Sequence, residues 1–216
     1  VTSRMYGATA PRAVPRAIGG LAFDWVAVVL NVLFVSGLYL DGWAHNHGRV
    51  DESFFTPWHA FFYSGFGLIV LLMVFTVLIN RVRGYPWQRA TPAGYALSWV
   101  GVVIFAAGGL GDLIWHEIFG VEEDLEALLS PTHLALIIGL ALIVSGPLRA
   151  AWQRIGRRPT WRTLGAALFS LTALISSFTF IMMYAHPVTF NIAGATHREF
   201  DRDIGQMAGG LGMLVT

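Results

Sequence analysis

The chain has 216 residues, of which 55% are hydrophobic and only 12% are charged, and its formal net charge is +1. Soluble domains carry roughly 25% charged residues, so this composition excludes an ordinary water-soluble domain and a disordered tail. The absence of cysteine excludes a disulfide framework and a thiolate metal site, and the near-neutral charge gives no general attraction for nucleic acid. The class of protein that this composition leaves is a polytopic helical membrane protein.

The chain begins with a polar segment at 1–20 that contains proline and arginine and lacks the apolar core of a secretory signal. The remainder, 21–216, is expected to form one transmembrane domain. Its repeats are predicted at about 21–80 and 95–152, with a third hairpin at about 163–216.

Five segments are long and apolar enough to cross a bilayer, which takes about 20 mostly apolar residues. A sixth apolar stretch begins near Ile204 and is still running at Thr216, so we expect the natural chain to continue. The expected fold class is therefore all-α, a polytopic membrane bundle of about six transmembrane helices built from repeated helical hairpins. The five full spans are predicted at about 21–44, 57–80, 95–118, 131–152 and 163–186.

Arginine and histidine divide between the two ends of this bundle. The connections at 1–20, 81–94 and 149–162 hold eleven of the 14 arginines, so the positive-inside rule predicts that this side is cytoplasmic. All seven histidines fall on the opposite side, which predicts a function for them at the extracytoplasmic face: His45, His47, His59, His116, His133, His186 and His197.

The first outer hairpin combines three elements that suit ligand chemistry. It ends its outgoing helix with Asp41-Gly-Trp-Ala-His45, crosses an acidic loop and begins its return helix with Thr56-Pro-Trp-His59. Asp and His four residues apart share one helical face. A threonine followed by proline is a typical helix start, so His59 is expected in the first turn of the returning helix.

The second outer hairpin repeats this pattern with Asp112-Leu-Ile-Trp-His116, a longer acidic loop and Ser130-Pro-Thr-His133. Each hairpin should therefore bring one carboxylate and two imidazoles together near the membrane surface. Imidazole and carboxylate suit Cu, Zn, Fe or Mn. Asp112 interrupts an apolar run, where an acid costs about 2.5–3.5 kcal/mol on insertion scales, so it should have a partner.

Other polar residues have weaker patterns. Asp24, in the first span, is expected to pair with an arginine near the cytoplasmic side. His47 is two residues from His45 and faces away from it on a helix, so a loop position is expected. An interfacial histidine is often only an amphipathic side chain, and Asp-x3-His can be a local pair. One set of acidic residues either holds or steers a cation or forms a solvated loop: Glu117, Glu122, Glu123, Asp124 and Glu126. His186 and His197 flank a third outer loop without the Asp-x3-His element, and are either a decayed third hairpin or interfacial residues.

The first hairpin resembles the C subunit of copper-containing membrane monooxygenases, the particulate methane and ammonia monooxygenase family. That subunit carries an Asp-Gly-x-x-His block, an acidic stretch and Phe-Thr-Pro-x-His. The counterparts here are Asp41-Gly-Trp-Ala-His45 and Phe55-Thr-Pro-Trp-His59.

The second hairpin is similar to a further block of the same family, commonly Asn-x3-His, an acidic loop and Pro-x-His. Here the matching residues are Asp112-Leu-Ile-Trp-His116 and Pro131-Thr-His133, with Asp112 in place of the usual Asn. The resemblance covers roughly 38–140.

The resemblance implies two neighbouring copper sites and the insertion of one oxygen atom of O2 into a C–H or N–H bond. It further implies a quinol as electron donor and a hetero-oligomeric complex with A and B subunits. The two implied ligand sets are Asp41, His45 and His59, and Asp112, His116 and His133.

The leading hypothesis is a copper-binding integral membrane subunit of a membrane monooxygenase complex, in a bacterial inner membrane, acting on a small apolar or nitrogenous substrate. Zinc and iron are the alternative metals. A non-catalytic metal-binding or structural accessory subunit is the first alternative, and a haem-binding redox anchor is the second. Haem would favour histidines facing each other deep in the bundle, without the carboxylates present here.

Overall fold

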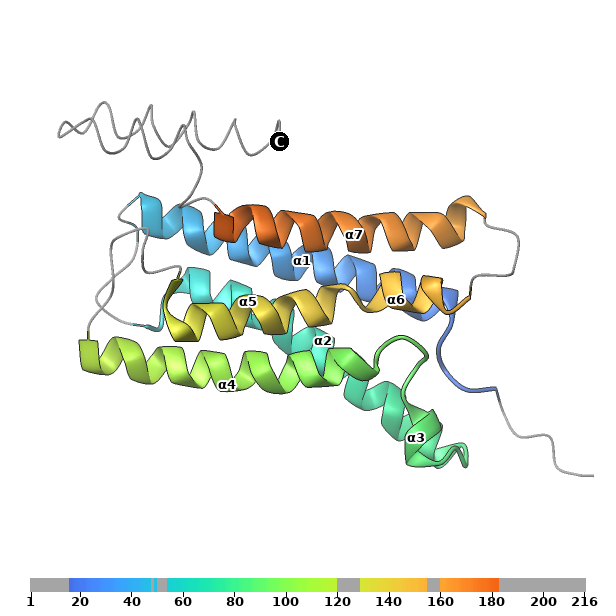
Figure 1. Cartoon of the computed structure of the whole chain (residues 1–216). Coiled ribbons are helices and arrows are strands. Elements are labelled where there is room, and N and C mark those ends of the chain that lie inside the picture. Colours follow the sequence, from blue (N-terminus) through green and yellow to red (C-terminus); the bar gives the residue numbers. More distant parts are fainter. Residues whose placement is uncertain (1–15, 48, 50–53, 120–128, 155–159, 183–216) are drawn as a thin grey trace, which may run out of the picture.

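The computed structural model describes residues 16–47, 49, 54–119, 129–154 and 160–182, and within these ranges every regular element is a helix (Figure 1). The helices run side by side as a bundle, in which α1 packs against α2 and α7, and α4 packs against α5. The elements are α1 (Leu21–Asn46), α2 (Pro57–Val82), α3 (Trp87–Ala90), α4 (Ala96–Phe119), α5 (Pro131–Val144), α6 (Gly146–Trp152) and α7 (Trp161–Ile181).

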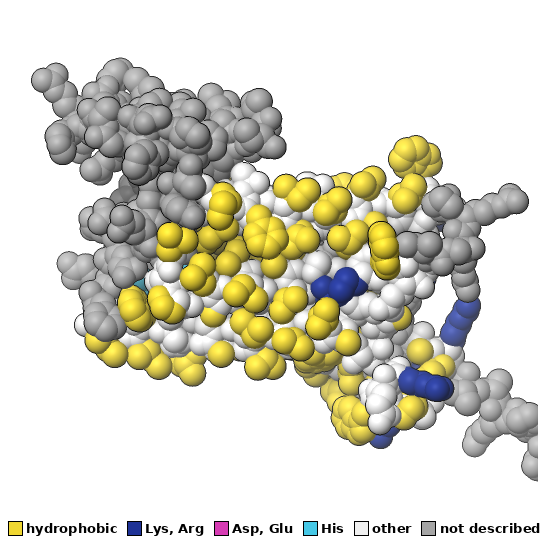
Figure 2. Space-filling model, in the orientation of Figure 1, with side chains coloured by type: hydrophobic (Ala, Val, Ile, Leu, Met, Phe, Trp, Pro, Cys, Tyr) yellow, Lys and Arg dark blue, Asp and Glu magenta, His cyan; other side chains and the backbone are white. Residues whose placement is uncertain are grey.

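Five segments of this bundle are long and apolar enough to span a membrane, namely α1, α2, α4, α5 together with α6, and α7. Exposed large apolar side chains on these segments include Val29, Phe75 and Val103. Figure 2 shows hydrophobic side chains spread over the face of the bundle that it presents. Exposure of such extended apolar faces to water is unfavourable, whereas their contact with lipid chains is favourable. The all-α polytopic fold is confirmed, and the protein is a multi-pass membrane protein in a lipid bilayer. The predicted sixth span at 204–216 lies outside the described residues.

The predicted fourth span at 131–152 is not one continuous helix. It breaks between α5 and α6 because Pro147 has no N–H and its ring would clash with the preceding turn. The freed carbonyl of Val144 accepts from Asn31 Nδ2 at 3.2 Å and from Ser170 Oγ at 2.6 Å, and Leu148 N donates to Ser170 Oγ at 3.1 Å. Polar side chains of α1 and α7 thus replace the hydrogen bonds that the break removes from the apolar interior.

Close contacts through glycine hold α1 against α2. A Cβ on Gly37 would lie 2.8 Å from the Cα of Phe62, and a Cβ on Gly65 would lie 2.8 Å from the Cα of Phe34. Only glycine permits this approach of the two backbones. These contacts lie about one to two turns from the Asp/His motifs along the same two helices. They therefore set the separation of α1 and α2 where these helices carry Asp41, His45 and His59.

The second hairpin, α4 with α5, repeats these contacts at equivalent positions. A Cβ on Gly108 would lie 3.1 Å from Leu136 N, and one on Gly139 would lie 2.7 Å from Phe105 N. Aligning Asp41 with Asp112 pairs Gly37 with Gly108 and Phe34 with Phe105, and aligning His59 with His133 pairs Phe62 with Leu136 and Gly65 with Gly139. The predicted repeat therefore extends from the ligand motifs into the helix packing.

Phe34 and Phe105, which are equivalent in this repeat, contact each other at the centre of the bundle. Both are 0% exposed, and their ring centroids lie 5.0 Å apart. Contact between equivalent residues is what an approximate twofold relation between two hairpins produces. The two hairpins consequently present their motif ends in the same direction.

A buried ion pair lies near the opposite end of the bundle. Asp24 is 1% exposed, forms an ion pair with Arg154 and accepts a hydrogen bond from the Tyr95 hydroxyl at 3.0 Å. This confirms the predicted pairing of Asp24. Burial, with a further contribution from Asp24, raises the pKa of Tyr95, so its hydroxyl keeps the proton that it donates.

Candidate metal centres

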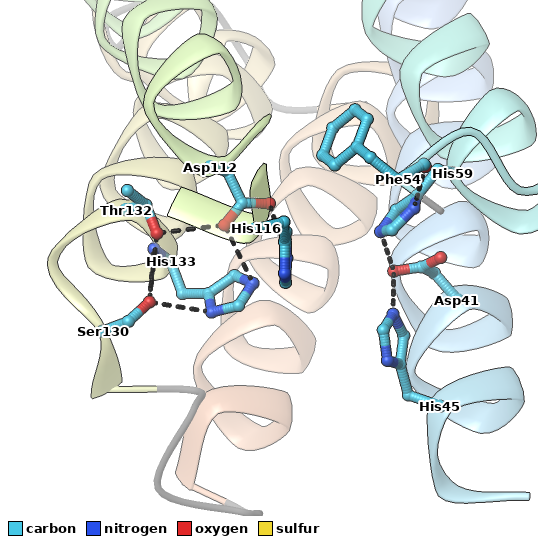
Figure 3. A network of polar contacts seen from close by, with 9 residues as sticks. All are labelled: Asp41, His45, Phe54, His59, Asp112, His116, Ser130, Thr132 and His133. Carbon is cyan, nitrogen blue, oxygen red and sulfur yellow. Dashed lines mark hydrogen bonds and ion pairs between the residues drawn. The ribbon is translucent and has the colours of Figure 1, made fainter. Parts of the chain in front are cut away.

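The six predicted ligands gather at one end of the bundle, where α1 and α4 end and α2 and α5 begin (Figure 3). The two return helices start as the sequence predicted. Thr56 Oγ1 accepts from His59 N at 3.1 Å, and Ser130 Oγ accepts from His133 N at 3.3 Å, with proline in the first turn of both helices. The caps place His59 and His133 in the first turn of each return helix.

The first group consists of Asp41, His45 and His59. His45 Nε2 lies 3.8 Å and His59 Nε2 lies 3.5 Å from the same carboxylate oxygen, Asp41 Oδ2. His59 Nδ1 lies 2.7 Å from the carbonyl oxygen of Phe54, a pure acceptor, so Nδ1 carries the proton and donates it. The lone pair of His59 therefore resides on Nε2, on the side that faces the carboxylate.

The second group consists of Asp112, His116 and His133. The Asp112 side chain is 3% exposed, with Oδ2 3.7 Å from His116 Nε2 and Oδ1 3.5 Å from His133 Nε2. The structure thus brings together each set of three residues that the sequence proposed. The partner expected for the intramembrane acid Asp112 is present in these two imidazoles.

The spacing within both groups suits ligands of a shared ion. The Nε2–carboxylate distances of 3.5 to 3.8 Å exceed the range of about 2.7–3.2 Å for a direct N–H···O bond. Two ligands bound at about 2.0–2.1 Å to one ion can lie up to about 4.2 Å apart. The ligand atoms of each group lie within 4.8 Å of one another, so small adjustments of the side chains complete a three-ligand set. Two nitrogens and one carboxylate oxygen fit copper, zinc or iron.

The hydroxyl groups of Ser130 and Thr132 form hydrogen bonds with the second group, a role that the sequence did not predict. Thr132 Oγ1 donates to Asp112 Oδ1 at 3.0 Å, Ser130 Oγ lies 3.1 Å from Thr132 Oγ1, and Ser130 Oγ lies 3.0 Å from His133 Nδ1 (Figure 3). The signal was available, because Thr132 occupies the variable position of the repeated Ser/Thr-Pro-x-His motif, where the first hairpin has Trp58.

In the part of the chain that the structure describes, no such hydroxyl contacts the carboxylate of the first group. Among the described residues, the buried Oδ1 of Asp41 has no hydrogen-bond partner. Trp58 directs its indole elsewhere and donates from Nε1 to the carbonyl of Arg49 at 3.0 Å. The two groups therefore share ligands and geometry and differ in what supports the carboxylate.

Phe54 lies between the two groups. Its ring stacks on His59 at a centroid distance of 4.8 Å and lies 6.0 Å from the ring of His116. Phe54 thus contacts one histidine of each group, so the two groups are neighbours. They form two neighbouring centres with an aromatic ring between them. The sequence pattern gave no indication of this role for Phe54.

Of the weaker candidates, the two that the structure describes, His47 and Glu117, are not part of either group. His47 stacks on Trp43 at a centroid distance of 4.7 Å, and its Nδ1 bonds to the Trp43 carbonyl at 2.8 Å. Glu117 is exposed on the last turn of α4. Outside the described residues lie Glu122, Glu123, Asp124, Glu126, His186 and His197.

Comparisons of the chain with protein-family models, with curated proteins and with solved structures find no match.

Proposed function

We propose that this chain is the copper-binding integral membrane subunit of a membrane monooxygenase complex that oxidises a small apolar or nitrogenous substrate with O2. One observation carries the proposal. Two Asp/His/His groups lie side by side at one end of a membrane bundle, each with Nε2–carboxylate distances of 3.5 to 3.8 Å.

The donor chemistry supports copper. Neutral imidazoles with one carboxylate suit Cu(II), and three protein ligands leave room for O2 or substrate. Copper, when bound, supplies the redox chemistry that activates O2. The chain holds the ligand atoms in position: Phe54 orients His59 through its carbonyl oxygen at 2.7 Å, and Thr132 orients Asp112 through its hydroxyl at 3.0 Å.

The distribution of arginine supports an extracytoplasmic location for the metal groups. Of the arginines in the described ranges, Arg49 alone lies at the metal end, and those of the other end follow the positive-inside pattern. We therefore place the groups at the outer face of a bacterial inner membrane. The proposed complex contains further membrane subunits and receives electrons from a quinol.

A second candidate function is metal binding without catalysis, as an accessory subunit that holds or passes a cation. The exposure of one histidine in each group favours this alternative, because His45 is 29% and His133 is 28% exposed at the side chain. An ion could reach either group from the membrane surface through these side chains.

Metal analysis of the complex purified from native membranes tests the proposal. We expect two copper ions per chain, together with oxygen consumption that depends on added ammonia or a short alkane. His45→Ala and His116→Ala should each remove one copper and reduce turnover, whereas His47→Ala should leave both unchanged.

Two results would redirect the assignment. Copper at full occupancy without substrate-dependent oxygen consumption would favour the accessory function. Zinc in place of copper, or no metal at all, would refute the monooxygenase proposal.

A further inference from the structure

The two metal groups occupy equivalent positions in duplicated hairpins, and one side chain makes their surroundings unequal. The repeated start of the return helix is Ser130-Pro-Thr132-His133 in the second hairpin and Thr56-Pro-Trp58-His59 in the first. Thr132 and Trp58 therefore stand at the same position. Thr132 reaches the carboxylate of its group, and Trp58 does not.

The hydrogens of the second group can be assigned one by one. Asp112 Oδ1 only accepts, so the Thr132 hydroxyl uses its single hydrogen there. Thr132 Oγ1 must then accept the hydrogen of Ser130, which leaves Ser130 Oγ as the acceptor for His133 Nδ1. His133 is consequently protonated on Nδ1, and its Nε2 presents a lone pair 3.5 Å from Asp112 Oδ1.

This chain of hydrogen bonds links two ligands of one group, Asp112 and His133, before any ion arrives. It fixes the carboxylate and selects the tautomer that binds metal. Asp112 is also deeply buried, at 3% side-chain exposure, and His116 is 7% exposed. These two ligands are shielded from solvent, and the hydrogen-bonded side chains need little rearrangement to bind an ion.

The first group lacks the corresponding support. His59 is oriented by Phe54, but Asp41 Oδ1 is buried and has no hydrogen-bond partner among the described residues. Asp41 and His45 are more exposed than Asp112 and His116, at 13% and 29% of the side chain, whereas His59 is less exposed than His133, at 11% against 28%. A buried carboxylate oxygen without a donor is unfavourable, and Asp41 lacks the hydrogen bond that fixes its counterpart Asp112.

We infer that the two groups have different roles: the Asp112 group retains its metal tightly, and the Asp41 group is the exchangeable site, because no hydrogen bond from the described residues fixes Asp41 Oδ1. Thr132 is the positioning residue that creates the difference. The inference deepens the proposed function and rests on its claim that both groups bind copper. Outer hydrogen bonds of this kind typically change metal affinity 10- to 100-fold.

The test measures copper release to excess EDTA from the full chain in detergent, followed by the electron paramagnetic resonance signal of Cu(II). Wild-type protein should release its two ions in two phases of equal amplitude. His45→Ala leaves only the Asp112 group intact and should show the slow phase. His116→Ala leaves only the Asp41 group intact and should show the fast phase, about 10- to 100-fold quicker.

Matched variants isolate the hydroxyl. In the His45→Ala background, Thr132→Val should speed release about 10- to 100-fold, and Thr132→Ser should restore slow release. In the His116→Ala background, Trp58→Thr should slow release relative to Trp58→Val, since both remove the indole and only threonine adds a hydroxyl. A single elution peak and unchanged helical circular dichroism establish that each variant is folded.

The outcomes separate the inference from the proposed function. Equal release rates from the two groups, or Thr132→Val releasing copper as slowly as Thr132→Ser, would overturn the inference while both copper sites stand. Failure of the folded wild-type protein to bind copper at either group would overturn the proposed function and the inference together.

Discussion

Gly65→Ala tests whether the close approach of α1 and α2 sets the geometry of the first metal group. The added Cβ would lie 2.8 Å from the Cα of Phe34, where ordinary contact requires about 3.5–4.0 Å. The backbones must therefore separate by about 0.7–1.2 Å, because the obstructing atom is main chain and no rotamer change can relieve it. Metal ligands tolerate deviations of about 0.2 Å, so the displacement reaches the site.

Overpacking of this kind costs about 1–3 kcal/mol in the free energy of unfolding. Gly67→Ala is the matched control on the same helix, because its Cβ would meet nothing within 4 Å. Alanine there should stabilise the helix by up to about 1 kcal/mol in intrinsic propensity. Both values are measurable by titrating the purified protein from detergent micelles into denaturing micelles.

Copper retention at the first group is the second readout of the same pair of variants. Gly65→Ala should weaken it, and Gly67→Ala should leave it unchanged. The reasoning is refuted if Gly65→Ala unfolds at the same denaturant fraction as Gly67→Ala and holds copper equally well.

Three further predictions use the same unfolding assay. Ser170→Ala removes two of the three hydrogen bonds described at the α5–α6 break and should cost about 1–3 kcal/mol, whereas Ser177→Ala, which loses only a bond within its own helix, should cost less; equal losses would contradict the role of Ser170. Arg154→Ala leaves the Asp24 carboxylate buried without its cation and should cost about 3 kcal/mol, with part recovered in the Asp24→Asn double variant. Free copper at 100 times the Kd of one group should stabilise the wild-type protein by about 2.7 kcal/mol through that group, and an undiminished total stabilisation in a protein that carries Asp112→Ala would argue against that ligand.

The spans, and the proximity of the three residues in each Asp/His/His group, could be predicted because both depend on local patterns. Twenty apolar residues cross a bilayer whatever surrounds them, and an Asp-x3-His motif shares a helical face without help from tertiary structure. The position of His59 followed from the Thr-Pro cap, which acts within one turn.

The break between α5 and α6 was missed for a different reason. The segment 131–152 does form one membrane span, as predicted. Pro147 is flanked by apolar residues on both sides, and the sequence alone did not show that this span consists of two helices. Whether proline ends a helix depends on partners for the freed carbonyls, and those partners, Asn31 and Ser170, come from distant helices. Sequence patterns do not give such contacts.

The surroundings of the ligands were equally inaccessible. Phe54 contacts both groups only because the two hairpins lie side by side, which is a tertiary arrangement. The hydrogen bond from Thr132 to Asp112 joins the start of α5 to α4, and the sequence marks it only as a difference between repeats.

A metal-resolved density map of the copper-loaded protein in a lipid nanodisc tests the central claim most directly. The account predicts two separate ion peaks, each about 2.0–2.1 Å from two histidine Nε2 atoms and an aspartate oxygen, with the Phe54 ring between them. A map in which these six side chains turn away from one another, with no ion between them, would contradict it.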